Sequence, residues 1–463
     1  MRTVRTEVLS ALVVAFALIP ESIAFSVITG VDPSVGLTTS FTMAVVISIA
    51  GGRPAMISAA TGAISLVVAP IAREYGFGHL VAAVILGGLF QIVLGSLGVA
   101  KLMRFVPRSV MAGFLNGLGI LIFLAQLPNL VNVPWQVYPL FAAGLVLIIL
   151  FPAVTKAIPA PLVSIAVLTA FTIAAGISVP TVGDKGALPS ALPTPGIPDV
   201  PFTVDTFALL APYALAFAVV GLLESLMTAR VVDDITDTHS NKKREAVGQG
   251  IANVVTGFFG GMGGCAMIGQ TLINVKTGGA RTRLSTFLAG AFLIVLCIVF
   301  RPIVSGIPMA VLVSVMVLVA VTTFDWNSIA PATLRHTPIG ETAAMVLTVG
   351  VVVATHNLAI GVVAGTLISM VVFARRVAHK VDVTAATSED NSQVVYAIKG
   401  ELFFASSNDL MYQFDYPNDP GKVVIDLSEA RIWDASSVAA LRTIATKYAT
   451  RGKQVEITGV PAG

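Results

Sequence analysis

Charged side chains are scarce in this sequence. They make up 11% of its 463 residues, whereas 56% of the residues are hydrophobic. A soluble globular protein has about a quarter of its residues charged, so this balance excludes an ordinary soluble fold and places the chain in a lipid bilayer. The formal net charge of +3 gives no indication of a nucleic-acid-binding surface.

Cysteine is also rare. The two cysteines, Cys265 and Cys297, both lie inside apolar stretches, so the sequence predicts neither a disulfide framework nor a zinc site. The sequence has no Walker A motif, which leaves ATP-driven pumping without support. We therefore expect no enzyme and no cofactor.

The apolar residues are grouped in runs that suit membrane spans. A spanning helix needs about 20 apolar residues, and breaks at Gly, Pro and charge clusters divide residues 1–379 into about fourteen segments. They begin near residues 8, 35, 54, 79, 107, 136, 159, 206, 245, 263, 284, 306, 339 and 357. The first run follows Arg2 and Arg5 without a small-residue cleavage pattern, so we expect a retained first span.

Basic residues predict the orientation, because Lys and Arg concentrate in cytoplasmic loops. With the N-terminus inside, only Arg73, Lys185 and Arg301 fall outside. We therefore expect a multi-pass protein of the cytoplasmic (inner) membrane with both termini in the cytosol. The Pro-rich stretch 179–201 then joins two halves, about 1–178 and 204–379. Each half has seven segments, so the second must be inverted relative to the first.

Each half has a short, Gly-interrupted third segment, at 54–72 and 263–278. In inverted-repeat carriers such a matched pair points to the binding site. We interpret each as an extended stretch followed by a half-helix whose positive N-terminus faces an anion. The alternative is that these glycines only let helices pack closely. The expected substrate-binding residues are Thr61, Gly62, Ala63, Ala266, Met267, Ile268, Gly269 and Gln270.

Carboxylates inside apolar spans are costly and therefore candidates for function. Glu224, with Thr228 one turn further on the same face, predicts a proton or sodium site. Glu21, which follows Pro20, and Ser225 are further candidates. The alternative is a buried Glu satisfied by a neighbouring helix. No metal is expected unless sodium binds at Glu224.

Several fragments, in order, resemble the SulP family, the sulfate permease or solute carrier family 26 anion transporters. They are residues 19–25, 60–62, 223–225, 249–253, 260–265, 274–276 and 278–283. The resemblance implies core and gate domains that move against each other like an elevator, an anion bound between the third and tenth segments, and a homodimer.

The chain is also similar to BicA-type sodium/bicarbonate carriers. That similarity implies that Thr61 lies at the first half-helix and that Glu224 is the cation-coupling residue, assisted by Thr228. Those carriers have Asp where this chain has Glu224, which favours proton coupling as much as sodium coupling. Met267 and Ile268 stand where they have a small residue and a hydroxyl.

After residue 379 charged residues become denser, and short alternating strands and helices predict a cytosolic α/β domain over 380–463. Residues 426–428 and 434–441 resemble the STAS domain, in which a Ser at the helix start can be phosphorylated. That Ser maps to Ser436, although Ser is also a common N-cap. We expect a short or truncated domain with a cytosolic partner.

The leading hypothesis is proton- or sodium-coupled symport of bicarbonate, sulfate or a dicarboxylate. An uncoupled exchanger or channel of the same fold would not need Glu224. The SulP-like fragments and the STAS-like tail count against a nucleobase symporter. A membrane sensor that signals through the tail would not move substrate.

Overall fold

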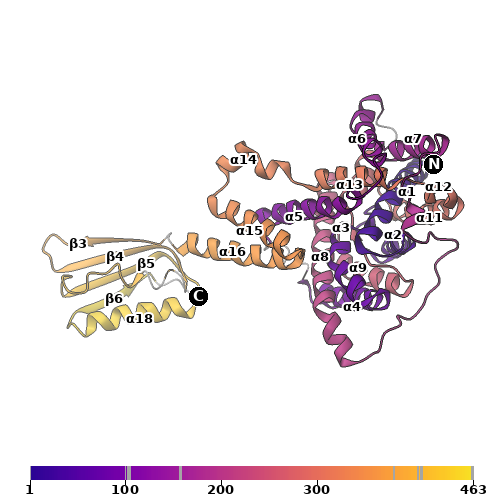
Figure 1. Ribbon diagram of the computed structural model, residues 1–463. Coiled ribbons are helices and arrows are strands. Elements are labelled where there is room, and N and C mark those ends of the chain that lie inside the picture. Colours follow the sequence, from indigo (N-terminus) through magenta and orange to yellow (C-terminus); the bar gives the residue numbers. More distant parts are fainter. Residues whose placement is uncertain are drawn as a thin grey trace. The chain divides into compact units, whose positions relative to one another are not determined.

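The computed structural model describes residues 2–99, 101, 106–155, 159–378, 381–403, 406 and 410–459. The N-terminal part of the chain is helical, and the C-terminal part is a small sheet with a helix (Figure 1). The contacts divide the chain into two units, Met1–Thr366 and Leu367–Gly463. The expected domain boundary between residues 379 and 380 lies outside the described residues.

The helices follow the fourteen expected segments. The first half contains α1 (Arg2–Thr29), α2 (Pro33–Ala50), β1 (Ser58–Ala59), α3 (Gly62–Tyr75), α4 (Phe77–Ser96), α5 (Arg108–Gln126), α6 (Val137–Val154) and α7 (Ala160–Ala174). The second half contains α8 (Val204–Thr236), α9 (Lys242–Phe258), β2 (Cys265–Ala266), α10 (Ile268–Leu272), a π-helix (Ile273–Thr277), α11 (Arg283–Val299), α13 (Met309–Thr323), α15 (Ile339–Thr355) and α16 (Leu358–Ala378). Shorter helices are the 3-10 turns Leu127–Leu130, Val182–Lys185 and Trp326–Ile329, together with α12 (Arg301–Ser305) and α14 (Pro331–His336).

Many of these helices suit a bilayer. By length and composition, seven of the described helices can cross a membrane, namely those that contain α1, α2, α4, α5, α6, α8 and α16. Four more, α7, α11, α13 and α15, are apolar but shorter. The chain is therefore a multi-pass membrane protein, as predicted from its composition.

The packing of the helices repeats between the two halves. α4 packs against α9 and α8, and α11 packs in the same way against α2 and α1. Likewise α5 packs against α15, and α13 packs against α6. The helices at the same place in the two halves are α1 and α8, α2 and α9, α4 and α11, α5 and α13, and α6 and α15. Under this correspondence the pair α4–α9 becomes α11–α2, the pair α4–α8 becomes α11–α1, and the pair α5–α15 becomes α13–α6. The predicted seven-plus-seven inverted repeat is confirmed.

Glycines bring α4 and α9 into backbone contact. A Cβ atom on Gly250 would lie 2.6 Å from the carbonyl oxygen of Gly88, and one on Gly88 would lie 2.8 Å from that of Gly250. No real side chain fits at such distances, so each helix can approach the other only because both residues lack one. In a membrane this close approach supplies the van der Waals contact that holds helices together.

Charged side chains gather at one end of the helical unit. Arg53, in the loop before β1, pairs with Asp233 of α8 at 3.0 Å, and Lys242 of α9 pairs with the same carboxylate at 2.6 Å. Glu245 accepts hydrogen bonds from the N–H groups of Gly52 and Arg53, at 2.7 and 2.9 Å. These bonds tie the loop between α2 and β1 to both α8 and α9.

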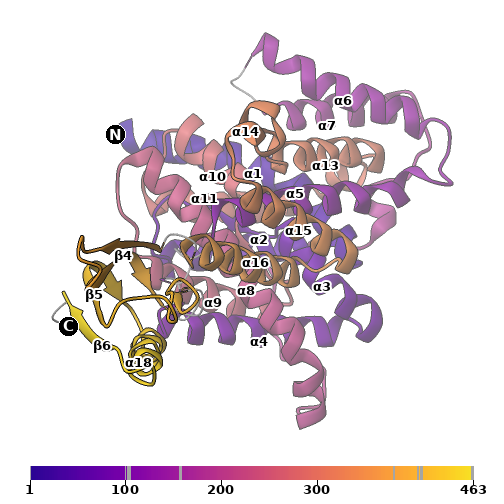
Figure 2. The same cartoon turned by 90° about the vertical axis from the view of Figure 1, so that its left-hand side faces the viewer.

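The C-terminal unit has a four-stranded sheet in the order β3-β4-β5-β6, with α18 against it (Figure 2). The elements are β3 (Asp382–Thr387), β4 (Gln393–Leu402), β5 (Lys422–Ile432), α18 (Ala435–Ala449) and β6 (Gln454–Thr458). β3 pairs antiparallel with β4, and the other pairs are parallel. Val423 and Ile425 of β5 pack with Leu441, Ile444 and Tyr448 of α18. The predicted α/β domain is confirmed.

The start of α18 separates two interpretations of Ser436. The N-cap is Asp434, whose side chain accepts from the N–H of Ser437 at 3.0 Å. Ser436 is exposed in the first turn. Ser436 is therefore not the helix cap, and its phosphorylation stays a prediction.

The contact between α4 and α9 gives a prediction about stability. We expect Gly250→Ala to lower the melting temperature by several degrees, because overpacking a tight contact costs about 1–3 kcal/mol. Gly350→Ala in α15 is the matched control, since nothing lies within 4 Å of its added Cβ. The measurement is thermal unfolding of both purified proteins in detergent. If the two variants had equal melting temperatures, the packing of α4 against α9 would not depend on this close contact.

Candidate functional site

The two Gly-interrupted segments meet inside the helical unit. β1 and β2 pair antiparallel, with Ser58 opposite Ala266 and Ala59 opposite Cys265. Both strands are fully buried. Each strand leads directly into a helix, so α3 and α10 begin beside the strand pair. We call this strand pair, Ser58–Ala59 with Cys265–Ala266, the crossing. A Cβ on Gly264, just before β2, would lie 2.1 Å from the carbonyl oxygen of Ala59, so only glycine permits the strands to come this close.

The two helix N-termini differ in the space around them. Thr61 is the N-cap of α3, and its hydroxyl accepts from the N–H of Ile64 at 3.4 Å. A Cβ on Gly62 would lie 2.8 Å from a carbon atom of Ile122, so this terminus is packed. Nothing lies within 4 Å of a Cβ added to Gly269 in α10. The open space therefore lies beside α10.

The expected substrate residues fall on both sides of this crossing. Thr61, Gly62, Ala63, Ala266, Met267 and Gln270 are buried, Ile268 is half-buried, and Gly269 is exposed. The structure thus brings together two groups of residues that are about 200 positions apart in the sequence. Their role in binding stays a prediction.

Glu224 of α8 reaches the crossing through a cysteine. The thiol of Cys265 donates to Oε2 of Glu224 at 2.9 Å, and the same sulfur lies 3.1 Å from Oγ1 of Thr61. Glu224 is 8% exposed, Thr61 is 2% exposed and Cys265 is fully buried. The carboxylate and the cap of α3 are therefore joined by a hydrogen-bonded chain, Thr61–Cys265–Glu224.

The two hydroxyls near Glu224 bond to main-chain groups. Thr228 donates to the carbonyl oxygen of Glu224 at 2.8 Å and to that of Ala266 at 3.4 Å. Ser225 accepts from the N–H of Ala266 at 3.1 Å. These bonds fasten α8 to β2, and they bring the hydroxyl of Thr228 together with the carbonyl oxygens of Glu224 and Ala266.

Glu21 of α1 forms a hydrogen bond with a residue of α10. Its Oε1 accepts from the side-chain amide of Gln270 at 2.8 Å. Oε1 of Gln270 is buried and has no hydrogen-bond partner among the described residues. Two carboxylates thus bond directly to side chains of the segment that contains β2 and α10, Glu224 to Cys265 and Glu21 to Gln270.

Sequence reasoning missed Cys265 and the polar pair that positions its neighbour. Asn253 of α9 bonds both the N–H and the carbonyl of Gly264, at 2.9 and 3.0 Å, and it donates to Gln91 of α4 at 2.9 Å. Polar residues inside apolar helices were the available signal for Asn253 and Gln91. For Cys265 there was none, because its partners lie far away in the sequence.

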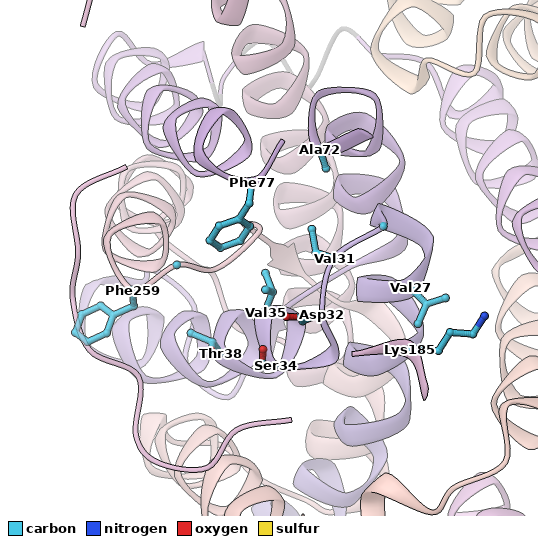
Figure 3. Close-up of a pocket in the computed structure, with 12 residues that line it drawn as sticks. Val27, Val31, Asp32, Ser34, Val35, Thr38, Ala72, Phe77, Lys185 and Phe259 are labelled. Carbon is cyan, nitrogen blue, oxygen red and sulfur yellow. The ribbon is translucent and has the colours of Figure 1, made fainter. Parts of the chain in front are cut away.

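A cavity of about 710 Å³ lies elsewhere in the helical unit. Figure 3 shows residues that line it. Asp32 and Ser34 come from the turn between α1 and α2 and the start of α2, and Phe77, Lys185 and Phe259 come from other parts of the chain. Its contact with α3 is at Ala72, near the end of the helix opposite Thr61. Among the described residues that line it, none belongs to the expected substrate site.

Comparisons with known proteins agree with this architecture. The family model described as Sulfate permease family matches residues 4–142 and 131–346, and the STAS domain model matches residues 383–462. A Bacillus subtilis protein named "Putative sulfate transporter YbaR" is 50% identical over 457 residues, covering 99% of this chain and 95% of its own. The Bicarbonate transporter BicA of Picosynechococcus is 25% identical over 514 residues, covering 99% and 89%.

Solved structures show the same fold. The transmembrane domain of a cyanobacterial BicA matches with a TM-score of 0.67 and 25% identity, over 79% of this chain and 98% of its own. The murine Solute Carrier 26 family member A9 in its inward-facing state matches with a TM-score of 0.84 and 16% identity, over 99% and 86%.

The family model covers well over half of the chain, and the relatives cover nearly all of it. The helical unit matches the sulfate permease family model, and the C-terminal unit matches the STAS domain model. The chain belongs to the sulfate permease (SulP, solute carrier 26) family, and it is an anion transporter of the membrane and not an enzyme.

Proposed function

We propose that this protein is a secondary active transporter that carries a small anion across the cytoplasmic membrane in symport with a proton or a sodium ion. The observation that carries the proposal is the chain Thr61–Cys265–Glu224, which joins a membrane carboxylate to the crossing where α3 and α10 begin. The names of the relatives favour bicarbonate or sulfate, and a dicarboxylate suits the same dipoles.

The anion binds between the N-termini of α3 and α10. The first N–H groups of a helix have no partner within it, and each N-terminus carries about half a positive charge. Gly62 and Ala63 supply such groups on one side, and Ile268, Gly269 and Gln270 supply them on the other. The attraction is strong in a dry site of low dielectric and weak once water enters. These backbone groups carry no full positive charge, so the hydrated site can release the anion.

The coupling cation binds at Glu224. An ionised carboxylate near the anion would repel it, and the low dielectric makes that repulsion strong. A proton on Glu224, or a sodium ion beside it, removes the repulsion. The hydroxyl of Thr228 and the carbonyl oxygens of Glu224 and Ala266 lie together, and oxygen atoms are the ligands that hard cations prefer. Anion and cation therefore favour each other's binding.

The packing of the helices supports an elevator-like motion. One group of helices packs mainly on itself, namely α1, α2, α3, α4, α8, α9, α10 and α11, and so does a second group, namely α5, α6, α7, α13 and α15. Contacts of α1 with α13 and of α3 with α5 join the two groups. We assign the first group to the moving core, which carries the site, and the second to the gate.

The charge distribution supports cytosolic termini. Arg53, Lys242, Arg244 and Arg283 all lie around the end of α2 and the start of α9. Because basic residues concentrate on the cytosolic side of a membrane protein, this end faces the cytosol. It is the same side to which the sequence assigns both termini.

Replacing the carboxylate tests the coupling. We expect Glu224→Gln to abolish accumulation of the anion against its gradient while leaving some anion binding, because the neutral amide does not take up a proton and lacks the negative charge that attracts a sodium ion. Glu341→Gln is the control, since Glu341 is exposed at the start of α15. The measurement is uptake of labelled bicarbonate, sulfate and dicarboxylates into proteoliposomes with imposed proton or sodium gradients. Concentrative uptake by Glu224→Gln at the wild-type level would exclude this role.

The open space beside α10 gives a second test. We expect Gly269→Leu to reduce anion uptake at least about tenfold with no loss of thermal stability, because nothing lies within 4 Å of a Cβ added there and the larger side chain takes up space that the anion needs. Gly269→Ala, which adds one methyl group, should retain most of the activity. Gly62→Leu should lower both uptake and stability, since its added atoms meet Ile122 and Phe25. Full uptake by Gly269→Leu would place the anion elsewhere.

A further inference from the structure

Cys265 lies between the proposed cation site and the helix that receives the anion. Its thiol contacts Glu224 at 2.9 Å and Thr61 at 3.1 Å. The residue is fully buried, and its main chain pairs with Ala59 across the strands. The sulfur therefore has little freedom to leave its two partners, and it has one hydrogen atom to share between them.

Two arrangements of the hydrogens satisfy this chain. When Glu224 is ionised and without a cation, the thiol donates to the carboxylate, and the hydroxyl of Thr61 donates to the sulfur. When Glu224 carries a proton, its O–H can donate to the sulfur, and the thiol then donates to Oγ1 of Thr61. A sodium ion on the carboxylate oxygen also releases the thiol toward Thr61. Only rotations about the Cβ–S and Cβ–O bonds are needed, and no covalent bond breaks.

The two arrangements leave Thr61 in different states. In the first its hydrogen is used by the sulfur. In the second its oxygen accepts from the thiol and from the N–H of Ile64, which uses both lone pairs, and its hydrogen is free to point at an anion at the start of α3. Occupation of Glu224 by a cation thus adds a donor to the anion site.

We propose that Cys265 is a positioning residue that makes anion binding at Thr61 depend on the cation at Glu224. This inference rests on the proposed function, because it assumes an anion at α3 and a cation at α8. The sign is that of symport, since the cation improves anion binding and, by linkage, the anion improves cation binding by the same factor.

Other carboxylates reach this region by separate routes. Glu21 of α1 bonds Gln270 of α10 at 2.8 Å. Glu245 of α9 bonds Gln249 at 2.9 Å, and that amide also donates to Ser58 of β1 at 2.7 Å. Neither of these bonds includes Cys265 or Thr61. A dependence on pH that comes from Glu21 or Glu245 should therefore persist when the thiol is removed.

The test compares the wild type with three substitutions at position 265. Binding of radiolabelled sulfate, and in parallel of bicarbonate, is measured on purified full-length protein as sodium is titrated at fixed pH and as pH is varied without sodium. The quantity is the ratio of anion affinities with and without the cation. We expect a ratio of about tenfold in the wild type, a typical coupling between sites. Cys265→Ser, which keeps one donor and its acceptors, should retain most of it.

Cys265→Ala should still bind the anion, but with a ratio close to one, because the link between Glu224 and Thr61 is gone. Cys265→Val, which has no thiol proton either, provides the same comparison should the alanine protein not fold. A wild-type ratio retained in these variants would overturn the role of Cys265 and leave the proposed symport intact. A ratio of one in the wild type would instead overturn the symport, and this inference with it.

Discussion

Backbone groups inside a bilayer have no water to bond, and the crossing of β1 and β2 is how this protein meets that constraint. Non-helical backbone is tolerated at membrane depth only where protein groups satisfy it. Here the strands pair with each other, and Ser225, Asn253 and Thr271 bond the main chain beside them. The helices around the crossing are held in place by these bonds, so the positions of α8, α9 and α10 all depend on it.

The same crossing gives the molecule its chemistry. A helix that starts beside the strand pair has unpaired N–H groups at its first turn, and two such helices start here. The surrounding helices then place Glu224 and Glu21 near these positive ends, each through one intervening side chain. In the proposed function, a dipole that attracts the anion and a carboxylate that repels it are balanced against each other. The proposed cation at Glu224 would shift that balance toward binding of the anion.

The division of the chain separates transport from any regulation. The residues proposed for binding and coupling all lie in the helical unit, whereas the STAS domain has its own core, built from Val423, Ile425, Leu441 and Ile444. Each unit therefore has a hydrophobic core of its own. Ser436 is exposed on the surface of the STAS domain.

The sequence by itself determined the membrane class, the fourteen segments, the inverted repeat and the STAS domain. The length of a hydrophobic run and the position of basic residues are local properties of the sequence, and in a bilayer they decide which segments span it and in which direction. It also singled out Glu224 and the two Gly-interrupted segments. Only the tertiary structure decided that Cys265 joins Glu224 to Thr61, that Gln270 holds Glu21, and that the open space lies beside Gly269. Hydrogen bonds and free volume arise between segments that are far apart in the sequence, as Glu21 and Gln270 are, and the pattern of residues in one segment does not indicate where the other segment will lie.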